Sequence, residues 1–389
     1  MPSANLAIYR NDYVVYAIGV VTCILLSLDF FRSRIFFVLA CYVVILFLNY
    51  FFESFINLGN ILSESFTIIV TACFCFNLFG NNYDKRLANC LTLLFGVIIV
   101  VYSIMTYIFY ISNPGIMRAA AMARNYETYH PYFLRGLAPY SFPHALTCII
   151  PALVLGIKNK HINPMKRWLS VMLLILSLVL IYITQATGAL IVAVVAIILS
   201  MIVKIGNAHK SVIPVVITSI FLLPLVISPE IQKWTIGLIE RLIGDDNFYS
   251  HKIEELEASV YGVEYEGDIA YRGSLLGETI DAILTHPFLG VSDMSYGEHN
   301  ALLDRWAEYG LIGLVPLLLG MVWLIKRCSR HLSKDVLIFY YIGIASSFLM
   351  MLTKSMFGWH QWFAFLIVLP VMIRFFSVET NNKLINVKN

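Results

Sequence analysis

Long apolar blocks separated by short polar connections dominate the pattern along the chain. A block of about 20 apolar residues is long enough to cross a bilayer as a helix. Such blocks occupy residues 13–29, 35–52, 64–80, 90–112, 143–157, 168–186, 188–203, 211–228, 310–325, 336–353 and 358–376. The block at 143–157 is short, so we predict an all-α polytopic membrane protein with about 11 (10–12) transmembrane helices.

Composition supports this class. Hydrophobic residues make up 59% of the 389 residues and charged residues 13%, whereas about a quarter of a soluble domain is charged. The first block begins near Asp12 and has no small-residue cleavage site, so we interpret it as a retained helix. The seven cysteines lie in or beside apolar blocks, which argues against a disulfide framework outside the membrane.

Basic residues alternate between the two sides of this map and set its orientation. One side has 17 of the 27 Lys and Arg residues and four acids, and the other has 10 basic residues and 20 acids. The positive-inside rule makes the first side cytoplasmic. We therefore divide the chain into helices at 1–228 with an outer loop at 113–142, a large outer loop at 229–309, and C-terminal helices with a cytoplasmic tail at 310–389.

The large loop at 229–309 is strongly acidic and contains two predicted helices. Its 16 acids and five basic residues give a net charge of −11. Helical spacing predicts one helix over 274–285, closed by His286 and Pro287. A second helix is predicted over 301–309, between Asn300 as its cap and Gly310, and runs into the next span. Loops of this length are usually functional.

Two side chains in this loop are candidates for chemistry. Arg272 is predicted at the start of the first helix, where the helix dipole and free backbone N–H groups favour an anion. It could clamp a phosphate or pyrophosphate, or pair with a loop carboxylate. His299 precedes the second helix and could take a proton from a hydroxyl, or be an exposed loop histidine. The residues alone leave both questions open.

Three motifs resemble those of the O-antigen ligase and polymerase family, which are membrane glycosyltransferases with a GT-C-type fold. They are Arg135-Gly136 with Phe142-Pro143-His144-Ala145, Arg272 with His286-Pro287-Phe288-Leu289-Gly290-Val291, and His299-Asn300 followed after nine residues by Gly310-Leu311-Ile312-Gly313. Order and topology agree from Arg135 to Gly313. Two departures stand out: the family usually has Asn at the position of His144, and an Arg that binds phosphate at the position of Thr187.

The resemblance implies a periplasmic active site in a multi-pass protein of the bacterial inner membrane, in lipopolysaccharide biosynthesis. A glycan would pass from undecaprenyl pyrophosphate to a sugar hydroxyl with inversion, without metal or other cofactor. Arg272, helped by Arg135, would stabilise the leaving pyrophosphate, and His299 would orient or deprotonate the hydroxyl. Asn300, Thr187 and Lys354 are further candidates for substrate binding, although Lys354 could instead snorkel to the interface.

The two candidate enzyme activities, ligase and polymerase, differ in the acceptor that they use. A ligase transfers the glycan to lipid A–core, and the His299-Asn300 motif favours this activity. A polymerase transfers it to another lipid-linked glycan, and Thr187 and the chain length favour that alternative. The alternative from another class is a lipid-linked oligosaccharide transporter. Few charges within the predicted spans and no symmetry between halves argue against it. The expected partners are the lipid-linked donor, the acceptor and membrane lipids, and no nucleic acid.

Overall fold

A computed structural model shows the architecture of the protein. It describes residues 28–52, 58–80, 85–113, 116, 131–133, 135–139, 141–184, 186–206, 208–218, 234, 268–291, 300–353 and 359–377. All regular structure in these residues is helical, as predicted. Within these described ranges, five helices are long and apolar enough to cross a membrane, and four shorter helices are also apolar.

The observed helices coincide with nine of the predicted spans. They are α3 (Arg34–Phe52), α4 (Leu58–Leu78), α5 (Lys85–Ser112), α8 (Ser141–Lys158), α9 (Pro164–Ile183), α10 (Thr187–Ile202), α15 (Ala301–Ser329), α16 (Leu337–Thr353), and a last one built from α17 (Trp359–Phe363), the π-helical η3 (Ala364–Val368) and α18 (Leu369–Phe376). Most of the predicted span 13–29 and part of 211–228 lie outside the described residues, so the total of about 11 stays a prediction.

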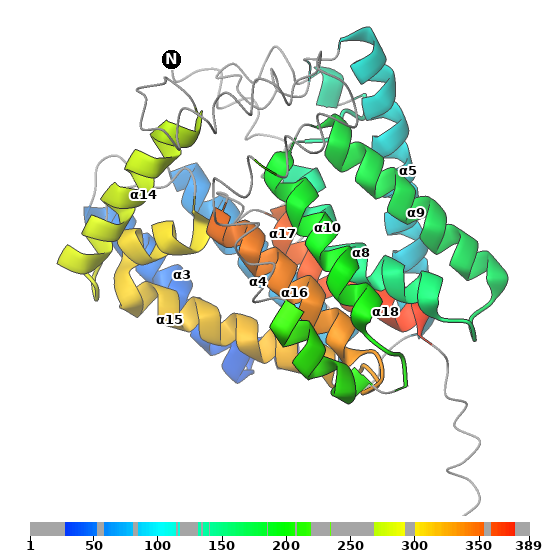
Figure 1. Ribbon diagram of the computed structural model, residues 1–389. Helices are drawn as coiled ribbons and strands as arrows, with labels where there is room; N and C mark the ends of the chain where they lie inside the picture. The colour runs from blue at the N-terminus through cyan, green and yellow to red at the C-terminus, as the bar shows by residue number, and fades with distance from the viewer. Residues whose placement is uncertain are drawn as a thin grey trace, which may run out of the picture.

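The remaining elements are short or lie beside the bundle. They are α2 (Leu28–Phe31), the 3₁₀ helix η1 (Ala208–Ser211) and α14 (Asp268–Thr285). Of these, α14 falls in the large acidic loop predicted from the sequence. It packs against α15 and lies at one flank of the bundle (Figure 1).

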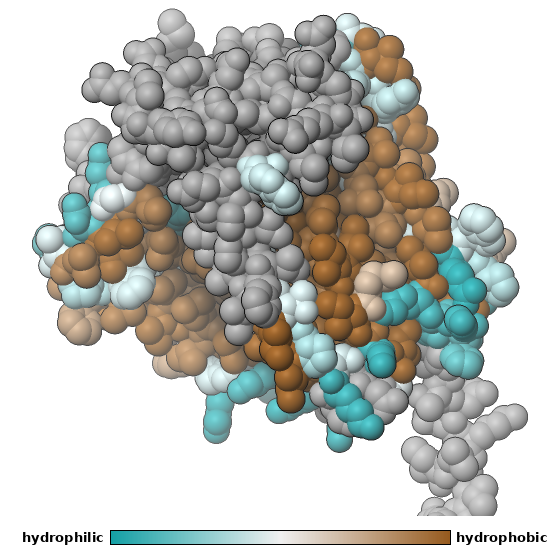
Figure 2. All heavy atoms as spheres, viewed as in Figure 1, coloured by the Kyte–Doolittle hydropathy of each residue, from teal (hydrophilic) through white to brown (hydrophobic). Residues whose placement is uncertain are grey.

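The helix α8 forms the centre of the bundle. It packs against α9, α10, α16 and α18, and nearly all of its side chains from Pro143 onward are buried. In Figure 1, α5 and α9 form one edge of the bundle, and α3, α14 and α15 form the other. The outer face of α5 exposes Leu94 and Val97 and belongs to a broad apolar surface (Figure 2). Such a surface fits contact with lipid.

Basic side chains cap the carbonyl ends of several helices at one end of the bundle, which we call the basic end. Lys158 Nζ donates to Val203 O at 2.6 Å, and Lys166 Nζ donates to Phe375 O at 3.1 Å. Arg327 Nε donates to Phe76 O at 3.0 Å, at the C-terminal ends of α15 and α4. Cations are favourable at helix C-termini because of the helix dipole. These residues belong to the side predicted to be cytoplasmic.

Candidate functional site

A backbone clasp joins the turn after α14 to a kink in α15. Gly310 has a non-helical backbone (φ 60°, ψ −173°) inside α15, so the helical hydrogen bonds are broken there. The turn at 286–291 supplies replacements. The N–H groups of Leu311 and Ile312 donate to the carbonyls of Pro287 and Phe288 at 2.9 and 3.1 Å, and Val291 N–H donates to Ala307 O at 2.8 Å. We call this set of bonds the clasp.

Side chains extend the clasp along the first two turns of α15. Trp306 Nε1 donates to Pro287 O at 3.1 Å. Ala282 and Ile283 of α14 are buried against Ala307 of α15, with further apolar side chains around them. The helix that contains Arg272 is therefore packed against the helix that begins after Asn300, and the turn that follows it is hydrogen-bonded to that same helix.

The clasp requires glycine at both of its crossing positions. Gly290 has φ 77°, and a Cβ atom there would lie 2.3 Å from the carbonyl oxygen of Glu308. A Cβ atom on Gly310 would lie 2.1 Å from Phe288 O, and its φ and ψ fall in a region that is essentially restricted to glycine. The motif glycines at 290 and 310 are thus explained by the close approach of two backbones.

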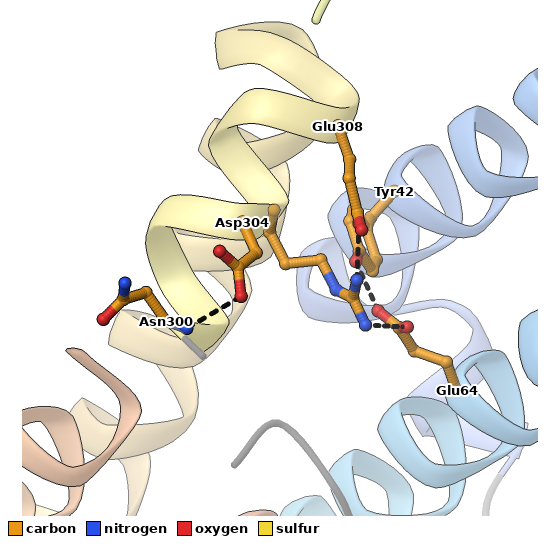
Figure 3. A network of polar contacts seen from close by, with 6 residues as sticks. Tyr42, Glu64, Asn300, Asp304 and Glu308 are labelled. Carbon is orange, nitrogen blue, oxygen red and sulfur yellow. Dashed lines mark hydrogen bonds and ion pairs between the residues drawn. The ribbon is translucent and has the colours of Figure 1, made fainter. Parts of the chain in front are cut away.

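A cluster of charged side chains lies on the same two turns of α15, facing α3 and α4 (Figure 3). Arg305 Nη2 contacts Glu64 Oε2 in α4 at 2.5 Å, and Arg305 Nη1 contacts Glu308 Oε2 at 2.5 Å. Tyr42 of α3 donates its hydroxyl to Glu64 Oε1 at 2.5 Å. We call Tyr42, Glu64, Arg305 and Glu308 the ion-pair cluster. It ties three helices together at the opposite end of α15 from Arg327.

The ion-pair cluster is shielded from solvent. The side chains of Arg305, Glu64 and Glu308 are 16%, 13% and 2% exposed. The ring of Tyr309 lies under the guanidinium at 5.7 Å and meets Tyr42 edge to face. Sequence reasoning missed this cluster, because Glu64 stood at the first position of a predicted span. Two features of the sequence could have indicated the cluster: an acidic residue at the border of an apolar helix, and a distant Asp-Arg-x-x-Glu run at 304–308 that contains its arginine partner.

Asn300 precedes α15 as its N-cap residue, as predicted, but its side chain forms no capping hydrogen bond. The cap is reversed: the backbone N–H of Asn300 donates to Asp304 Oδ2 at 2.8 Å. Asp304 is 2% exposed, and a buried carboxylate in the first turns of a helix is favoured by the helix dipole. Figure 3 shows Asp304 turned towards Asn300, away from Glu64.

The position of Arg272 corrects one step of the sequence argument. The helix α14 begins at Asp268, not at residue 274, so Arg272 lies in its second turn and not at its start. The free N–H groups of a helix belong to its first turn, and they are not adjacent in sequence to Arg272. A role for Arg272 in anion binding therefore depends on its guanidinium. His299 lies outside the described residues.

The other predicted binding residues are spread along the chain. Arg135 is exposed, in a segment attached to α5 through a bond from Ala138 N to Thr106 Oγ1 at 3.0 Å. Figure 1 places α5 and α14 on opposite flanks of the bundle. Thr187 is the first residue of α10. Lys354 lies outside the described residues.

The comparison with known families concerns the middle of the chain. The model of the O-antigen ligase family matches residues 172–318. The matched range includes Thr187, Arg272, His299, Asn300 and the whole clasp. It excludes Arg135, Lys354 and two members of the ion-pair cluster, Tyr42 and Glu64. No curated protein matches the chain in sequence.

Proposed function

We propose, from the match of residues 172–318 to the model of the O-antigen ligase family, that this membrane protein is a glycosyltransferase that uses a lipid-linked glycan. The donor is a glycan on undecaprenyl pyrophosphate, and the acceptor is a sugar hydroxyl. The clasp is the observation that supports this proposal most. It joins the helix containing Arg272 to the helix that starts directly after His299-Asn300, so both family motifs belong to one packed unit.

In the proposed reaction, the acceptor hydroxyl oxygen attacks the anomeric carbon of the donor. The bond from that carbon to the pyrophosphate oxygen breaks, and the pyrophosphate leaves with the electron pair. His299 takes the hydroxyl proton. Arg272 stabilises the charge that develops on the pyrophosphate, because a guanidinium stays charged and presents two N–H groups to two oxygens. Attack opposite the leaving group inverts the anomeric configuration.

The proposed location of the reaction follows from the two ends of α15. Arg327 lies at the basic end, whereas the clasp at Gly310 is 17 residues earlier along the helix, or about 25 Å at 1.5 Å per residue. A basic end on the cytoplasmic side puts the clasp on the periplasmic side. There the polyprenyl tail of the donor can remain among lipids while its pyrophosphate reaches the interface.

We assign the acceptor to lipid A–core, which makes the protein an O-antigen ligase, because His299-Asn300 directly precedes the clasped helix. The same family includes polymerases, which extend one lipid-linked glycan with another. Thr187 favours that alternative, since a threonine brings no charge to the site where the family usually has an arginine. Arg135, Asn300, Thr187 and Lys354 remain our candidates for substrate binding.

Transfer by the purified protein tests the function. The protein in detergent is given an undecaprenyl-pyrophosphate-linked glycan, with lipid A–core in one reaction and a second lipid-linked glycan in another. A ligase forms product only with lipid A–core, and a polymerase only with the lipid-linked acceptor. A transporter forms no new bond and needs a sealed bilayer. Absence of product in both reactions, from protein that remains folded, would contradict the proposed function.

A further inference from the structure

The ion-pair cluster holds the beginning of α15 from a side that the clasp does not reach. The clasp joins α15 to the turn at 286–291. Arg305 instead joins it to Glu64 of α4 and, through Tyr42, to α3, and both of those helices lie outside the family match at 172–318. The segment that begins at Asn300 is therefore anchored from two directions.

Stability alone is a weak reason for such a cluster. One guanidinium and two carboxylates lose hydration when they are buried, and their mutual attraction does little more than offset that loss. Apolar side chains of similar size often stabilise a protein as well or better. Charged contacts add direction, because the two N–H groups of Arg305 reach two different carboxylates. They fix the rotation of this part of α15 about its own axis and its position along that axis.

Asp304 connects this anchor to the residue before the helix. Its carboxylate accepts a hydrogen bond from the amide nitrogen of Asn300, and that nitrogen forms the peptide bond with His299. Asp304 and Arg305 are consecutive residues of one helix, so anchoring Arg305 to α4 also sets the position of Asp304. Figure 3 shows the two ends of this chain of contacts, from Asn300 to Glu64.

We propose that Arg305 is a positioning residue for the transfer reaction. Held by Glu64 and Glu308, it sets the position of the first two turns of α15, and Asp304 extends that restraint to the amide that follows His299. This inference rests on the proposed function. A displacement of about 1 Å at a reacting group can cost about 10²-fold in rate, so loss of the anchor should slow the chemical step.

The first test replaces Arg305 by lysine, which keeps the charge and loses the planar fork. We expect Arg305→Lys to lower kcat about 10²-fold and to leave the KM for the lipid-linked donor near its wild-type value. The matched control is Arg327→Lys, since Arg327 also links α15 to α4 but at the basic end. It should retain the wild-type kcat. A wild-type kcat in Arg305→Lys would overturn the proposal.

The second test separates positioning from stability by making the cluster apolar. The triple variant Glu64→Met, Arg305→Met and Glu308→Met is made together with Tyr42→Phe, because the buried Tyr42 hydroxyl would otherwise lose its acceptor on Glu64. It leaves no charge of the ion-pair cluster unpaired, so its thermal midpoint should stay near that of the wild type. Its kcat should still fall, because the directional contacts are gone. A combined variant that is both stable and fully active would overturn the proposal. A combined variant that does not fold would make the cluster a structural element and would overturn it too.

A third measurement does not depend on transfer. Hydrogen exchange of the backbone amides at 300–309 should be faster in Arg305→Lys than in the wild type, with no change near Arg327. Equal exchange in the two proteins would overturn the positioning role. If the wild-type protein forms no product with either acceptor, the proposed function fails while this measurement still reports on the anchor, so the two failures can be told apart.

Discussion

At the scale of single residues, the clasp depends on two glycines. The backbone of Gly310 occupies a conformation that costs other residues about 1–3 kcal/mol, and the carbonyl of Phe288 fills the space of its missing side chain. Gly290 is in the same situation against the carbonyl of Glu308. In each case the obstructing atom belongs to a backbone, so it cannot turn away as a flexible side chain can.

We therefore expect Gly290→Ala and Gly310→Ala each to lower the thermal midpoint and to abolish transfer, because the clasp must open to admit the new Cβ atom. Gly277→Ala is the matched control. Gly277 lies in α14 with open space around it, and alanine there should stabilise the helix by about 1 kcal/mol. Thermal unfolding followed by intrinsic fluorescence measures all three. A Gly310→Ala protein as stable as the control would contradict the requirement for glycine.

The chemical roles that we propose for Arg272 and His299 predict a sharp loss of activity on substitution. Arg272→Ala and His299→Ala should each abolish transfer and leave membrane insertion intact, and Arg272→Lys should retain little activity because the bidentate fork is lost. Arg241→Ala and His251→Ala, from the same acidic loop, serve as controls and should remain active. Glycan ladders of normal length from both site variants, measured by gel electrophoresis of the products, would refute the site.

Sequence alone predicted the residues of the clasp but not their contact. The motifs around Gly290 and Gly310 were recognised separately, and Gly310 was given only a local role as a helix end. Their crossing is a tertiary contact between backbones, which no periodicity encodes. The ion-pair cluster was missed for a related reason: Glu64 and Arg305 are 241 positions apart, and each alone has the pattern of a residue at a span border.

At the scale of elements, α15 consists of two parts that meet at the kink. The first part, from Ala301 to Tyr309, belongs to the candidate site, and the second crosses the bundle towards the basic end. The sequence predicted this division, with a helix over 301–309 that runs into the next span. It misplaced the start of α14 by six residues, because the helical spacing of leucine and isoleucine was recognised only over 274–285, while the helix begins at Asp268.

The attachment of Trp306 to the turn predicts a modest effect on stability. Trp306→Phe removes the hydrogen bond to Pro287 O and keeps most of the apolar contact with α14. It should lower the free energy of unfolding by about 1 kcal/mol. Trp323→Phe, further along α15, is the control and should change it less. Limited proteolysis near the turn at 286–291 provides the measurement, and equal cleavage rates in the two variants would contradict the expected weakening.

At the scale of the whole molecule, apolar length predicted the helices well, because crossing a bilayer imposes one length and one composition on every span. Nine predicted spans coincide with observed helices. The order in which they pack was not predictable, since their surfaces are apolar on all sides. The central place of α8 depends on small and apolar side chains that meet four other helices, and its sequence was the shortest of the predicted spans.

The orientation that the charge pattern predicts for the bundle can be tested by labelling from outside the cell. Single cysteines at Lys160 and Gly277, both exposed, are placed in a variant that lacks the seven natural cysteines. A maleimide that cannot cross membranes should label position 277 in cells stripped of their outer membrane. It should label position 160 only after the inner membrane is opened. The reverse pattern would invert the topology and move the clasp to the cytoplasmic side.

The central claim is that a lipid-linked pyrophosphate reacts beside the clasp, and a photoreactive donor tests it most directly. The purified protein is irradiated with an undecaprenyl-pyrophosphate glycan that has a diazirine next to the pyrophosphate, and the crosslinked peptides are identified by mass spectrometry. We predict crosslinks within 268–291 and 300–309, competed away by unlabelled donor. Competed crosslinks found only at the basic end, in 158–167 or 326–334, would contradict the account.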